Sequence, residues 1–551
     1  MKIEDKKIKV KILPNEEKII EVNYKSKIED LLKDNLCETE FTKIIAARVN
    51  NQVKSLQTNI VSDCDVEPIT YSDKDGYKIY MRTVKLVLFL AMRELYKDLK
   101  VELCNTIDSK SYFICHNFEF TDKMAENLAL KMQEIINKNL RITKENMSFE
   151  EAYAIYEFQQ DEEKLDNMEI KIKANVSMCE VDGIYASMHG IVAPTTGYIK
   201  NFGIKKFRKG FVLIYSSIED EEKIDLDVKE NKVFDVFEEF NGYADEMGVQ
   251  TISDLNQKII DGSIKNIIQT SEQIQERKLD EITEQIEKRQ DVKVVLISGP
   301  SCSGKTTFAK RLSNKLRQIG KEPLAISMDN YFKERVDTPK LPNGDYDFET
   351  VDALDLELFN NHMQKLLTGE TICVPNFNFY TGKKEYLNDF ARLNENTIII
   401  LEGIHALNPS VTKSISEDLK YKIYIAPMTT LNMDEFSKVS TTDTRVLRRI
   451  VRDYRTRGHS VEATLNMWPN ITVGENKYIY PFINRADYIF NTSLVYEVAV
   501  MSIYAKPVLL QVSTESKNYS EARRLYNFLS NFLTADERMV PQDSLFREFI
   551  G

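Results

Sequence analysis

One short segment constrains the fold more than any other part of the 551-residue sequence. Residues 292–297 form a nearly continuous apolar run of strand length, and a helical pattern over the residues up to Leu316 follows the next loop. That loop reads Gly299-Pro300-Ser301-Cys302-Ser303-Gly304-Lys305-Thr306. A strand, a glycine-containing loop and a helix in this order are typical of a P-loop, in which backbone N–H groups at the helix N-terminus donate to phosphate oxygens. The segment therefore predicts a phosphate site.

Each part of this loop has a predicted task. Lys305 can reach the β- and γ-phosphate oxygens of a nucleotide, and the hydroxyl of Thr306 can bind Mg²⁺. We therefore expect ATP and Mg²⁺ as cofactors. The predicted cofactor-binding residues of this loop are Gly299, Pro300, Ser301, Cys302, Ser303, Gly304, Lys305, Thr306 and Thr307.

Two acidic residues stand at the ends of further predicted strands. Glu402 ends the apolar run 398–401, and Asp329 follows the strand-like residues 323–328. Open α/β sheets bind ligands at the carboxyl ends of their strands, so we expect Glu402 to hold Mg²⁺ or its water. Asp329 is the predicted general base for an attacking hydroxyl. The structural alternatives are a solvated acid for Glu402 and a helix-capping or turn residue for Asp329.

A basic stretch lies at residues 443–458. Its arginines recur at three- and four-residue spacing, which places them together on a helix. In a chain of net charge −12 such a cluster invites an anionic partner, and a lid that closes over phosphoryl oxygens would use it. The alternatives are a solvated basic face or a patch that contacts RNA. The arginines of this cluster are Arg445, Arg448, Arg449 and Arg452, and Arg455 and Arg457 follow in the same stretch.

The length, the composition and the net charge of the sequence restrict the class of protein. The length and the 42% hydrophobic content are sufficient for about two to four domains with apolar cores. The net charge of −12 argues against general attraction to nucleic acid or anionic membranes. Seven cysteines without a C-x-x-C pair argue against a disulfide framework or a zinc site. With no signal peptide and no apolar run near the roughly 20 residues of a membrane span, we expect a cytoplasmic protein without a membrane partner.

The residues ahead of the P-loop predict two modules. Residues 7–24 alternate as a β-hairpin, a short helix follows at 28–33, and a strand at 44–49 completes the pattern of a β-grasp module.

The second of these modules is predicted to be α+β. Helical spacing over 81–99 and 122–139 frames strand-like sequence over 101–120, and further glycine-rich strands are expected over 168–216. The charged helix predicted at 264–289 is a connecting helix or, alternatively, a dimerising one. The predicted division is 1–69, β-grasp; 70–220, α+β; 221–290, helical linker; and 291–551, an α/β P-loop domain with a parallel sheet.

The order of motifs over residues 290–500 resembles that of the uridine kinase and phosphoribulokinase family. The resemblance rests on the P-loop and on Met328-Asp329-Asn330-Tyr331, Tyr346-Asp347-Phe348-Glu349-Thr350-Val351-Asp352-Ala353, Leu401-Glu402-Gly403 and Asp443-Thr444-Arg445. It implies Asp329 as the base, Glu402 near magnesium, and a lid bearing Arg449, Arg452 and Arg457. The resemblance thus adds Arg457 to the predicted cofactor-binding residues. The predicted catalytic residues are Asp329, Lys305, Arg449 and Arg452.

The resemblance also implies contacts with the phosphate acceptor. In uridine–cytidine kinases an acid at the position of Glu349 holds the ribose hydroxyls. The predicted substrate residues are Tyr331, Glu349, Phe377 and Arg449. The positions that read the base depart from the family: Phe377-Asn378-Phe379 replaces Tyr-Asp-Phe, Gly382 replaces His and Met467 replaces Gln. In the lid, His459 replaces an Arg that would contact phosphate or substrate.

The front of the chain resembles threonyl-tRNA synthetase, with a TGS-like module over 7–68 and an editing-like module over 70–216. The likeness rests on residues 90–101 and on Val192-Ala193-Pro194. The editing histidines are not intact, because the helical pair aligns with Arg82 and Leu86 and the later segment reads Ser187-Met188-His189. We therefore do not expect editing activity.

These features predict an ATP-dependent kinase that transfers the γ-phosphoryl group to the 5′-hydroxyl of a nucleoside, uridine or cytidine. One alternative is a kinase of another sugar-like alcohol. The other is an ATP-binding regulator associated with RNA or the ribosome, which would use RNA contacts of the N-terminal region. The sequence leaves open whether the chain forms a homo-oligomer. Among the histidines, His405 is a candidate to line the site, and His116 and His362 are expected to be structural.

Overall fold

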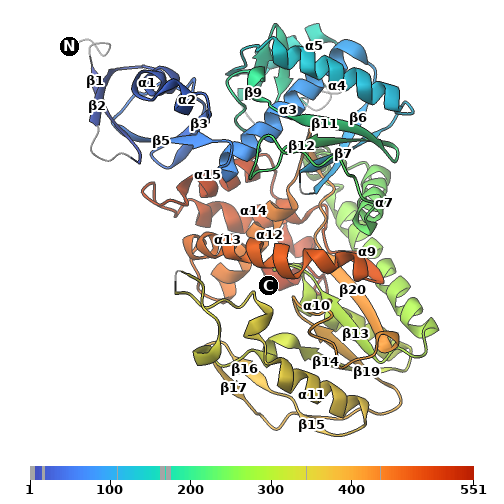
Figure 1. Cartoon of the computed structure of the whole chain (residues 1–551). Coiled ribbons are helices and arrows are strands. Elements are labelled where there is room, and N and C mark those ends of the chain that lie inside the picture. The colour runs from blue at the N-terminus through green and yellow to red at the C-terminus, as the bar shows by residue number, and fades with distance from the viewer. Residues whose placement is uncertain are drawn as a thin grey trace.

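The computed structural model describes residues 6–14, 19–107, 109–161, 165, 168, 175–342, 344–434 and 436–551. We call residues 6–70 the front module, residues 74–215 the middle module and residues 252–551 the C-terminal module. The helices α12 to α15 of the C-terminal module lie between its own sheet and the sheets of the other two modules (Figure 1).

The front module is a mixed sheet with two short helices. Its strands run in the order β2-β1-β5-β3-β4, and β1 and β5 are parallel. Ile8, Val10 and Ile12 are buried on one face of β1 and pack against Leu31 and Leu32. Residues 15–18 of the predicted hairpin lie outside the described residues. The elements are β1 (Lys7–Ile12), β2 (Ile19–Asn23), α1 (Ile28–Asn35), α2 (Glu38–Phe41), β3 (Ile44–Val49), β4 (Gln52–Lys54) and β5 (Cys64–Thr70).

The middle module packs two helices against an antiparallel sheet of order β11-β12-β7-β6, beside a second antiparallel sheet, β10-β9-β8. Helix α3 begins seven residues before the predicted start, because the charged residues Lys74, Asp75 and Lys78 hide the helical spacing of its first turns. Part of the strand-like region predicted over 168–216 lies outside the described residues. The elements are α3 (Lys74–Leu95), β6 (Val101–Ile107), β7 (Lys110–Cys115), α4 (Asp122–Asn137), β8 (Thr143–Ser148), α5 (Phe149–Gln159), β9 (Asn175–Val181), β10 (Ile184–Ser187), β11 (Phe202–Phe207) and β12 (Gly210–Tyr215).

The segment expected to link the modules is packed rather than free. Helix α7 (Lys232–Glu246) buries Phe234 between the middle module and the C-terminal sheet, whereas α9 (Ile264–Lys288) buries Ile268, Leu279 and Ile282 in the core of the C-terminal module. Helix α8 (Ile252–Ile260) joins the same core. The apolar stripe of α9, which suggested a dimerising helix as one alternative, is thus covered by this chain.

The C-terminal module is built on five parallel strands in the order β14-β19-β13-β20-β23. Its central strands are buried along their whole length, as expected for a sheet with helices on both faces. The elements are β13 (Val294–Ser298), α10 (Lys305–Gln318), β14 (Glu322–Ser327), α11 (Leu356–Leu367), β15 (Ile372–Cys373), β16 (Asn376–Asn378), β17 (Lys383–Glu385), β18 (Phe390–Ala391), β19 (Thr397–Glu402), β20 (Lys420–Ala426), β21 (Asn432–Asp434), β22 (Ser437–Lys438), α12 (Thr441–Thr456), α13 (Val461–Tyr478), β23 (Tyr488–Asn491), α14 (Glu497–Leu509), α15 (Tyr519–Leu529) and α16 (Arg547–Ile550).

A hairpin of the C-terminal module, β21–β22, inserts into the middle module just before α12 begins. Phe436 packs with Phe89 and Phe113 in the middle module's core. Lys438 donates to the carbonyl of Leu103 at 3.4 Å. Helix α12 is therefore anchored at its start to the middle module.

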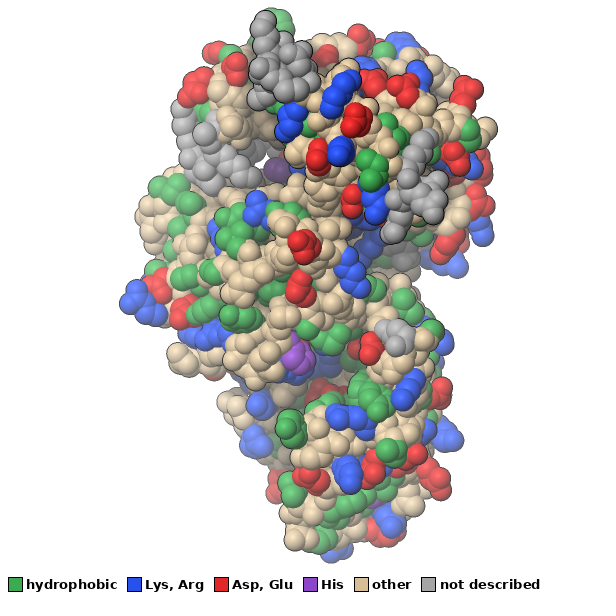
Figure 2. Space-filling view, turned by 90° about the vertical axis from the view of Figure 1, so that its left-hand side faces the viewer, with side chains coloured by type: hydrophobic (Ala, Val, Ile, Leu, Met, Phe, Trp, Pro, Cys, Tyr) green, Lys and Arg blue, Asp and Glu red, His purple; other side chains and the backbone are tan. Residues whose placement is uncertain are grey.

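Charges of both signs cover the surface. On the face drawn in Figure 2, basic and acidic side chains of the described residues are interspersed, and neither sign covers a continuous area. Within the described ranges, none of the helices combines the length and apolarity that crossing a bilayer would require.

Candidate active site

The loop between β13 and α10 curls tightly, and two glycines make this conformation accessible. A Cβ atom on Gly299 would overlap the carbonyl oxygen of Ile425, and Gly304 has a φ of +91°, in the left-handed region. The ammonium of Lys305 folds back over the loop and donates to the carbonyls of Gly299 at 3.0 Å and Pro300 at 3.1 Å. The ammonium group of Lys305 thus lies against the first residues of the loop.

Two backbone donors of this loop are already bonded to carboxylates from distant parts of the chain. The N–H of Ser301 donates to Glu475 of α13 at 3.0 Å, and the N–H of Thr307 donates to Glu548 of α16 at 3.1 Å. The side chain of Thr306 is exposed. Sequence reasoning missed both carboxylates, because they lie 174 and 241 residues from their partners and no local pattern connects them.

The two acids at the strand ends come together beside the loop. Ser327, the last residue of β14, pairs in register with Glu402, the last residue of β19, and Asp329 follows two residues later. Burial raises the pKa of Asp329, against the opposing charges of Lys305 and Arg457. Burial also raises the pKa of Glu402, and the nearby charge of Asp329 adds to the rise. The acids and Lys305 therefore lie close together at the carboxyl ends of the strands.

Glu349 joins the same group from the segment before α11. A Cβ atom on Gly474 would overlap the side chain of Glu349, so α13 approaches it closely. Burial, followed by the charge of Glu475, raises the pKa of Glu349 to about 7, while Arg449 and Lys305 oppose the rise. Glu349 is therefore divided between its neutral and ionised forms near neutral pH.

The first arginines of α12 are structural. Arg445 forms an ion pair with Glu475 and donates to the carbonyl of Ser301 at 2.9 Å. Arg448 pairs with Glu497 at 2.6 Å. All four charged side chains are buried. These arginines therefore brace the P-loop from behind and are not available to an external anion.

Arg449 and Arg452 of α12 and Arg457, which follows the helix, converge on one buried acid. Arg449, Arg452 and Arg457 lie 3.2, 2.8 and 3.6 Å from the carboxylate of Asp453. Arg449 also donates to the hydroxyl of Ser301 at 2.8 Å, which places it at the P-loop. The spacing of Asp453, four residues after Arg449 and four before Arg457, could have predicted these ion pairs.

Two of the predicted substrate residues, Tyr331 and Phe377, make contacts with groups other than the acids near the P-loop. Tyr331 is buried, and its hydroxyl is 3.1 Å from His362, so it bonds to that histidine rather than to Asp329 or Glu402. Phe377 packs edge-on against Phe332 and Phe379, and these three rings form an aromatic wall.

The space next to this wall at Gly382 is filled. A Cβ atom on Gly382 would overlap the side chain of Arg335, whose guanidinium donates to the carbonyl of Phe379 at 2.6 Å. Met467 packs against the core of the C-terminal module. His405 is buried under Tyr478, and burial lowers the pKa of His405 to about 4, so it is neutral at physiological pH.

Part of the C-terminal module matches a known protein family. Residues 294–499 match the model of the phosphoribulokinase/uridine kinase family. The uridine kinase of Mycoplasma genitalium is 33% identical over 180 residues, which cover 32% of this chain and 74% of that enzyme. This chain belongs to the phosphoribulokinase/uridine kinase family. The uridine kinase of Clostridium perfringens is 29% identical over 212 residues, 38% of this chain and 92% of that enzyme.

The N-terminal region has a separate relative. The threonine–tRNA ligase of Clostridium tetani is 27% identical over 185 residues, which cover 33% of this chain and 29% of the ligase. In the middle module Arg82 donates to the carbonyl of Ile191 at 2.5 Å, Leu86 is buried, and His189 lies 3.7 Å from Asp434. Arg82 thus holds the loop at Ile191 in place, and Leu86 packs in the core of the middle module.

The donors of the kinase-family site suit magnesium. The hydroxyl of Thr306 and the carboxylates of Glu402 and Asp329 are hard oxygen ligands, which Mg²⁺ prefers. The described residues hold no cluster of three or more acidic, cysteine or histidine ligands. The two carboxylates beside the P-loop fit Mg²⁺, which proteins usually hold through one or two carboxylates together with substrate phosphates.

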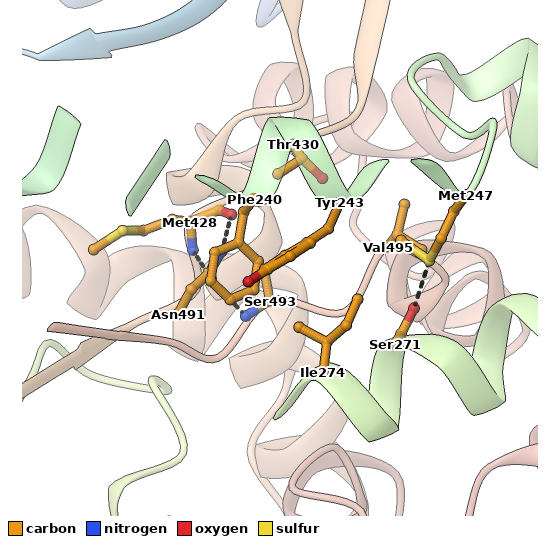
Figure 3. Close-up of a pocket in the computed structure, with 10 residues that line it drawn as sticks. All are labelled: Phe240, Tyr243, Met247, Ser271, Ile274, Met428, Thr430, Asn491, Ser493 and Val495. Carbon is orange, nitrogen blue, oxygen red and sulfur yellow. Dashed lines mark hydrogen bonds between the residues drawn. The ribbon is translucent and has the colours of Figure 1, made fainter. Parts of the chain in front are cut away.

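A separate small cavity lies away from this site. It is enclosed by α7, α9 and the loops after β20 and β23, with Phe240 and Tyr243 on one side and Ile274 on another (Figure 3). Asn491 bridges two segments there by donating to the carbonyl of Met428 at 2.8 Å. The cavity of about 20 Å³ has room for a single water, so it is not a nucleotide site.

Proposed function

We propose that the C-terminal module is a nucleoside kinase, which transfers the γ-phosphoryl group of ATP to the 5′-hydroxyl of uridine or cytidine. The observation that carries this proposal is the gathering of Lys305, Asp329, Glu349 and Glu402 around one P-loop, in a chain of the phosphoribulokinase/uridine kinase family. A P-loop alone serves many nucleotide-binding proteins, whereas acids placed for an acceptor hydroxyl are required only for transfer.

In this mechanism the acceptor hydroxyl approaches the γ-phosphorus in line. Asp329 accepts the hydroxyl proton, and its raised pKa makes it a stronger base than an exposed aspartate. Lys305 stabilises the charge that develops on the phosphoryl oxygens, with Arg449, Arg452 and Arg457 contributing from α12. Mg²⁺, held by Thr306 and Glu402, would neutralise charge on the phosphate chain. Glu349 accepts hydrogen bonds from the sugar hydroxyls.

A second acceptor class is supported by the aromatic wall. Arg335 fills the space beside Gly382, and Phe377 offers no hydrogen-bonding group to a base. A sugar-like alcohol without a base would need neither contact. We keep this kinase of another alcohol as the second candidate.

We also propose that residues 1–69 form a TGS-like module and residues 70–220 an editing-like module that has lost editing. The partial match to a threonine–tRNA ligase supports a likeness of the N-terminal region to that enzyme. Binding of tRNA by these modules, in a salt-sensitive manner, is the expectation of the alternative in which the chain is an ATP-dependent regulator.

The test is ADP release with Mg-ATP across ribonucleosides, deoxyribonucleosides, sugar alcohols and sugar phosphates, with Asp329→Asn measured beside the wild type. We expect turnover of uridine or cytidine, and we expect D329N to lower kcat by roughly 10²–10⁴-fold while ATP affinity is kept. Turnover of only a base-free alcohol would favour the second candidate. ATP binding without turnover of any acceptor would reject the kinase and favour the regulator.

A further inference from the structure

Residues 541–551 lie beyond the segment that matches the kinase family, and they pack against the P-loop. Leu545, Phe546, Phe549 and Ile550 are all buried in the core of the C-terminal module. The side chain of Leu545 lies so close to Gly304 that a Cβ atom on this glycine would overlap it. This segment, which we call the tail, is therefore held firmly at the nucleotide loop.

Helix α12 holds the tail from the other side. The guanidinium of Arg448 lies 4.8 Å from the centre of the Phe549 ring, and Arg455 donates to the carbonyl of Ile550. The tail thus fills the corner between the P-loop and the helix that carries the site's arginines.

One polar group of the tail points into the nucleotide site. The Glu548 carboxylate accepts the N–H of Thr307 at 3.1 Å. Its charge also raises the pKa of Glu402, after burial and Asp329, and contributes to the raised pKa of Arg452. Glu548 therefore lies among the groups proposed to bind Mg²⁺ and phosphate.

The donor that Glu548 occupies is one that a nucleotide needs. Thr307 is the third residue of α10, so its N–H has no acceptor within the helix and belongs to the set that cradles the phosphates in a P-loop. A carboxylate at this position satisfies the donor and repels a phosphate chain, because both carry negative charge.

We propose that Glu548 competes with the phosphate chain of the nucleotide for the N-terminus of α10. The carboxylate must leave Thr307 before a nucleoside di- or triphosphate can bind fully. The buried ring of Phe549 and the side chain of Leu545 keep the backbone in place, so rotation of the Glu548 side chain is sufficient for this release. The tail then acts as a built-in brake on nucleotide affinity. This inference rests on the proposed function only in that the P-loop binds a nucleotide.

The test is the affinity of the full chain for ATP, ADP and inorganic tripolyphosphate, measured by isothermal titration calorimetry without an acceptor. In Glu548→Gln the charge is removed and the shape is kept, so we expect each ligand to bind about tenfold more tightly than to the wild type. Adenosine has no phosphate and should gain nothing. Asp543→Asn is the matched control, because Asp543 is an exposed acid of the same segment, and it should leave all affinities unchanged.

Two further measurements make the result decisive. Glu548→Ala removes the acceptor as well as the charge and should tighten phosphate binding in the same direction. Melting temperatures without ligand report a purely structural role. If E548Q and E548A lower the melting temperature but leave ATP and ADP affinity unchanged or weaker, Glu548 is only a helix cap and the inference is wrong. Absence of nucleotide binding in every variant would also overturn it.

Failure of the inference and failure of the proposed function give different results. A chain that phosphorylates a nucleoside but gains no affinity in E548Q contradicts only the role of Glu548. A chain that binds ATP more tightly in E548Q but turns over no acceptor contradicts only the nucleoside kinase.

Discussion

The C-terminal and middle modules both enclose basic side chains, but they satisfy them differently. Near the P-loop, Arg445 and Arg448 each have a buried glutamate as partner. In the middle module, Arg82 and Lys144 donate instead to backbone carbonyls of residues 188–191. The pairing in the first case fixes the P-loop, and the carbonyl bonding in the second fixes the loop of residues 188–191.

The difference also appears in the pKa values of these basic side chains. Burial opposes the charge of Arg445, but Glu475 more than offsets it, so the pKa of Arg445 is raised. In the middle module burial prevails, and the pKa of Arg82 falls to about 10 and that of Lys85 to about 8. The charged form of Arg445 is thus stabilised near the P-loop, whereas the charged forms of Arg82 and Lys85 are destabilised in the middle module. Substitutions in the two modules should therefore have different effects on the stability of the protein.

The largest expected effect is in the C-terminal module. Glu475→Gln leaves Arg445 buried without its counter-charge, which should lower the free energy of unfolding by about 3–5 kcal/mol. The chain has a single tryptophan, Trp468, whose ring centre lies 5.2 Å from the Arg445 guanidinium, so urea unfolding followed by tryptophan fluorescence reports this module.

The control for that substitution is an exposed ion pair. Glu126→Gln breaks the contact with Lys123 on α4 and should change stability by less than about 0.5 kcal/mol. A loss of under ~1 kcal/mol in E475Q would mean that the buried pair is no more valuable than the exposed one, and the comparison between the modules would fail.

A smaller effect is expected in the pH dependence of the reaction. The pKa of Glu349 is raised to about 7, so the carboxylate ionises as pH rises from 6 to 8. Because the ionised form accepts hydrogen bonds from sugar hydroxyls, kcat/KM for the acceptor should rise by about tenfold over this range. Glu349→Gln should abolish this step. Glu357→Gln, an exposed acid on α11, should keep it. An unchanged pH profile in E349Q would exclude Glu349 as the titrating group.

The smallest expected effect tests the middle module. Lys85 is charged at pH 7 in both the folded and unfolded states, and its lowered folded pKa means that burial of this charge destabilises the fold. Lys85→Met should therefore stabilise the protein at pH 7, by roughly 1–2 kcal/mol. The gain should shrink as pH rises from about 8 towards 10, because the folded wild type then loses the proton. Differential scanning calorimetry of both proteins at pH 7 and pH 9.5 measures it.

Lys123→Met, at an exposed site, is the matched control and should change the melting temperature little at either pH. Destabilisation by K85M at pH 7 would show that Lys85 is effectively paired in the folded protein, like the arginines near the P-loop.

Several elements could be predicted because their signal is local. The apolar run before Gly299 gives β13, the run before Glu402 gives β19, and the charged amphipathic pattern over 264–289 gives α9 within one residue at its end. In contrast, α3 begins earlier than predicted, because tertiary packing of Tyr77 and Ile79 outweighs the charged residues Lys74, Asp75 and Lys78 of its first turns. Propensity and spacing describe a segment, but packing decides where it begins.

The sequence by itself determined the phosphate loop, the parallel sheet and the acids at its strand ends, since each follows from residues that are neighbours in the chain. Only the tertiary structure decided what occupies the donors of that loop. Glu475 and Glu548 reach Ser301 and Thr307 from 174 and 241 residues away. Such contacts depend on how distant helices pack, which periodicity and motif spacing do not encode. The physical reason is that backbone donors bind any well-placed acceptor, and only the complete fold places one.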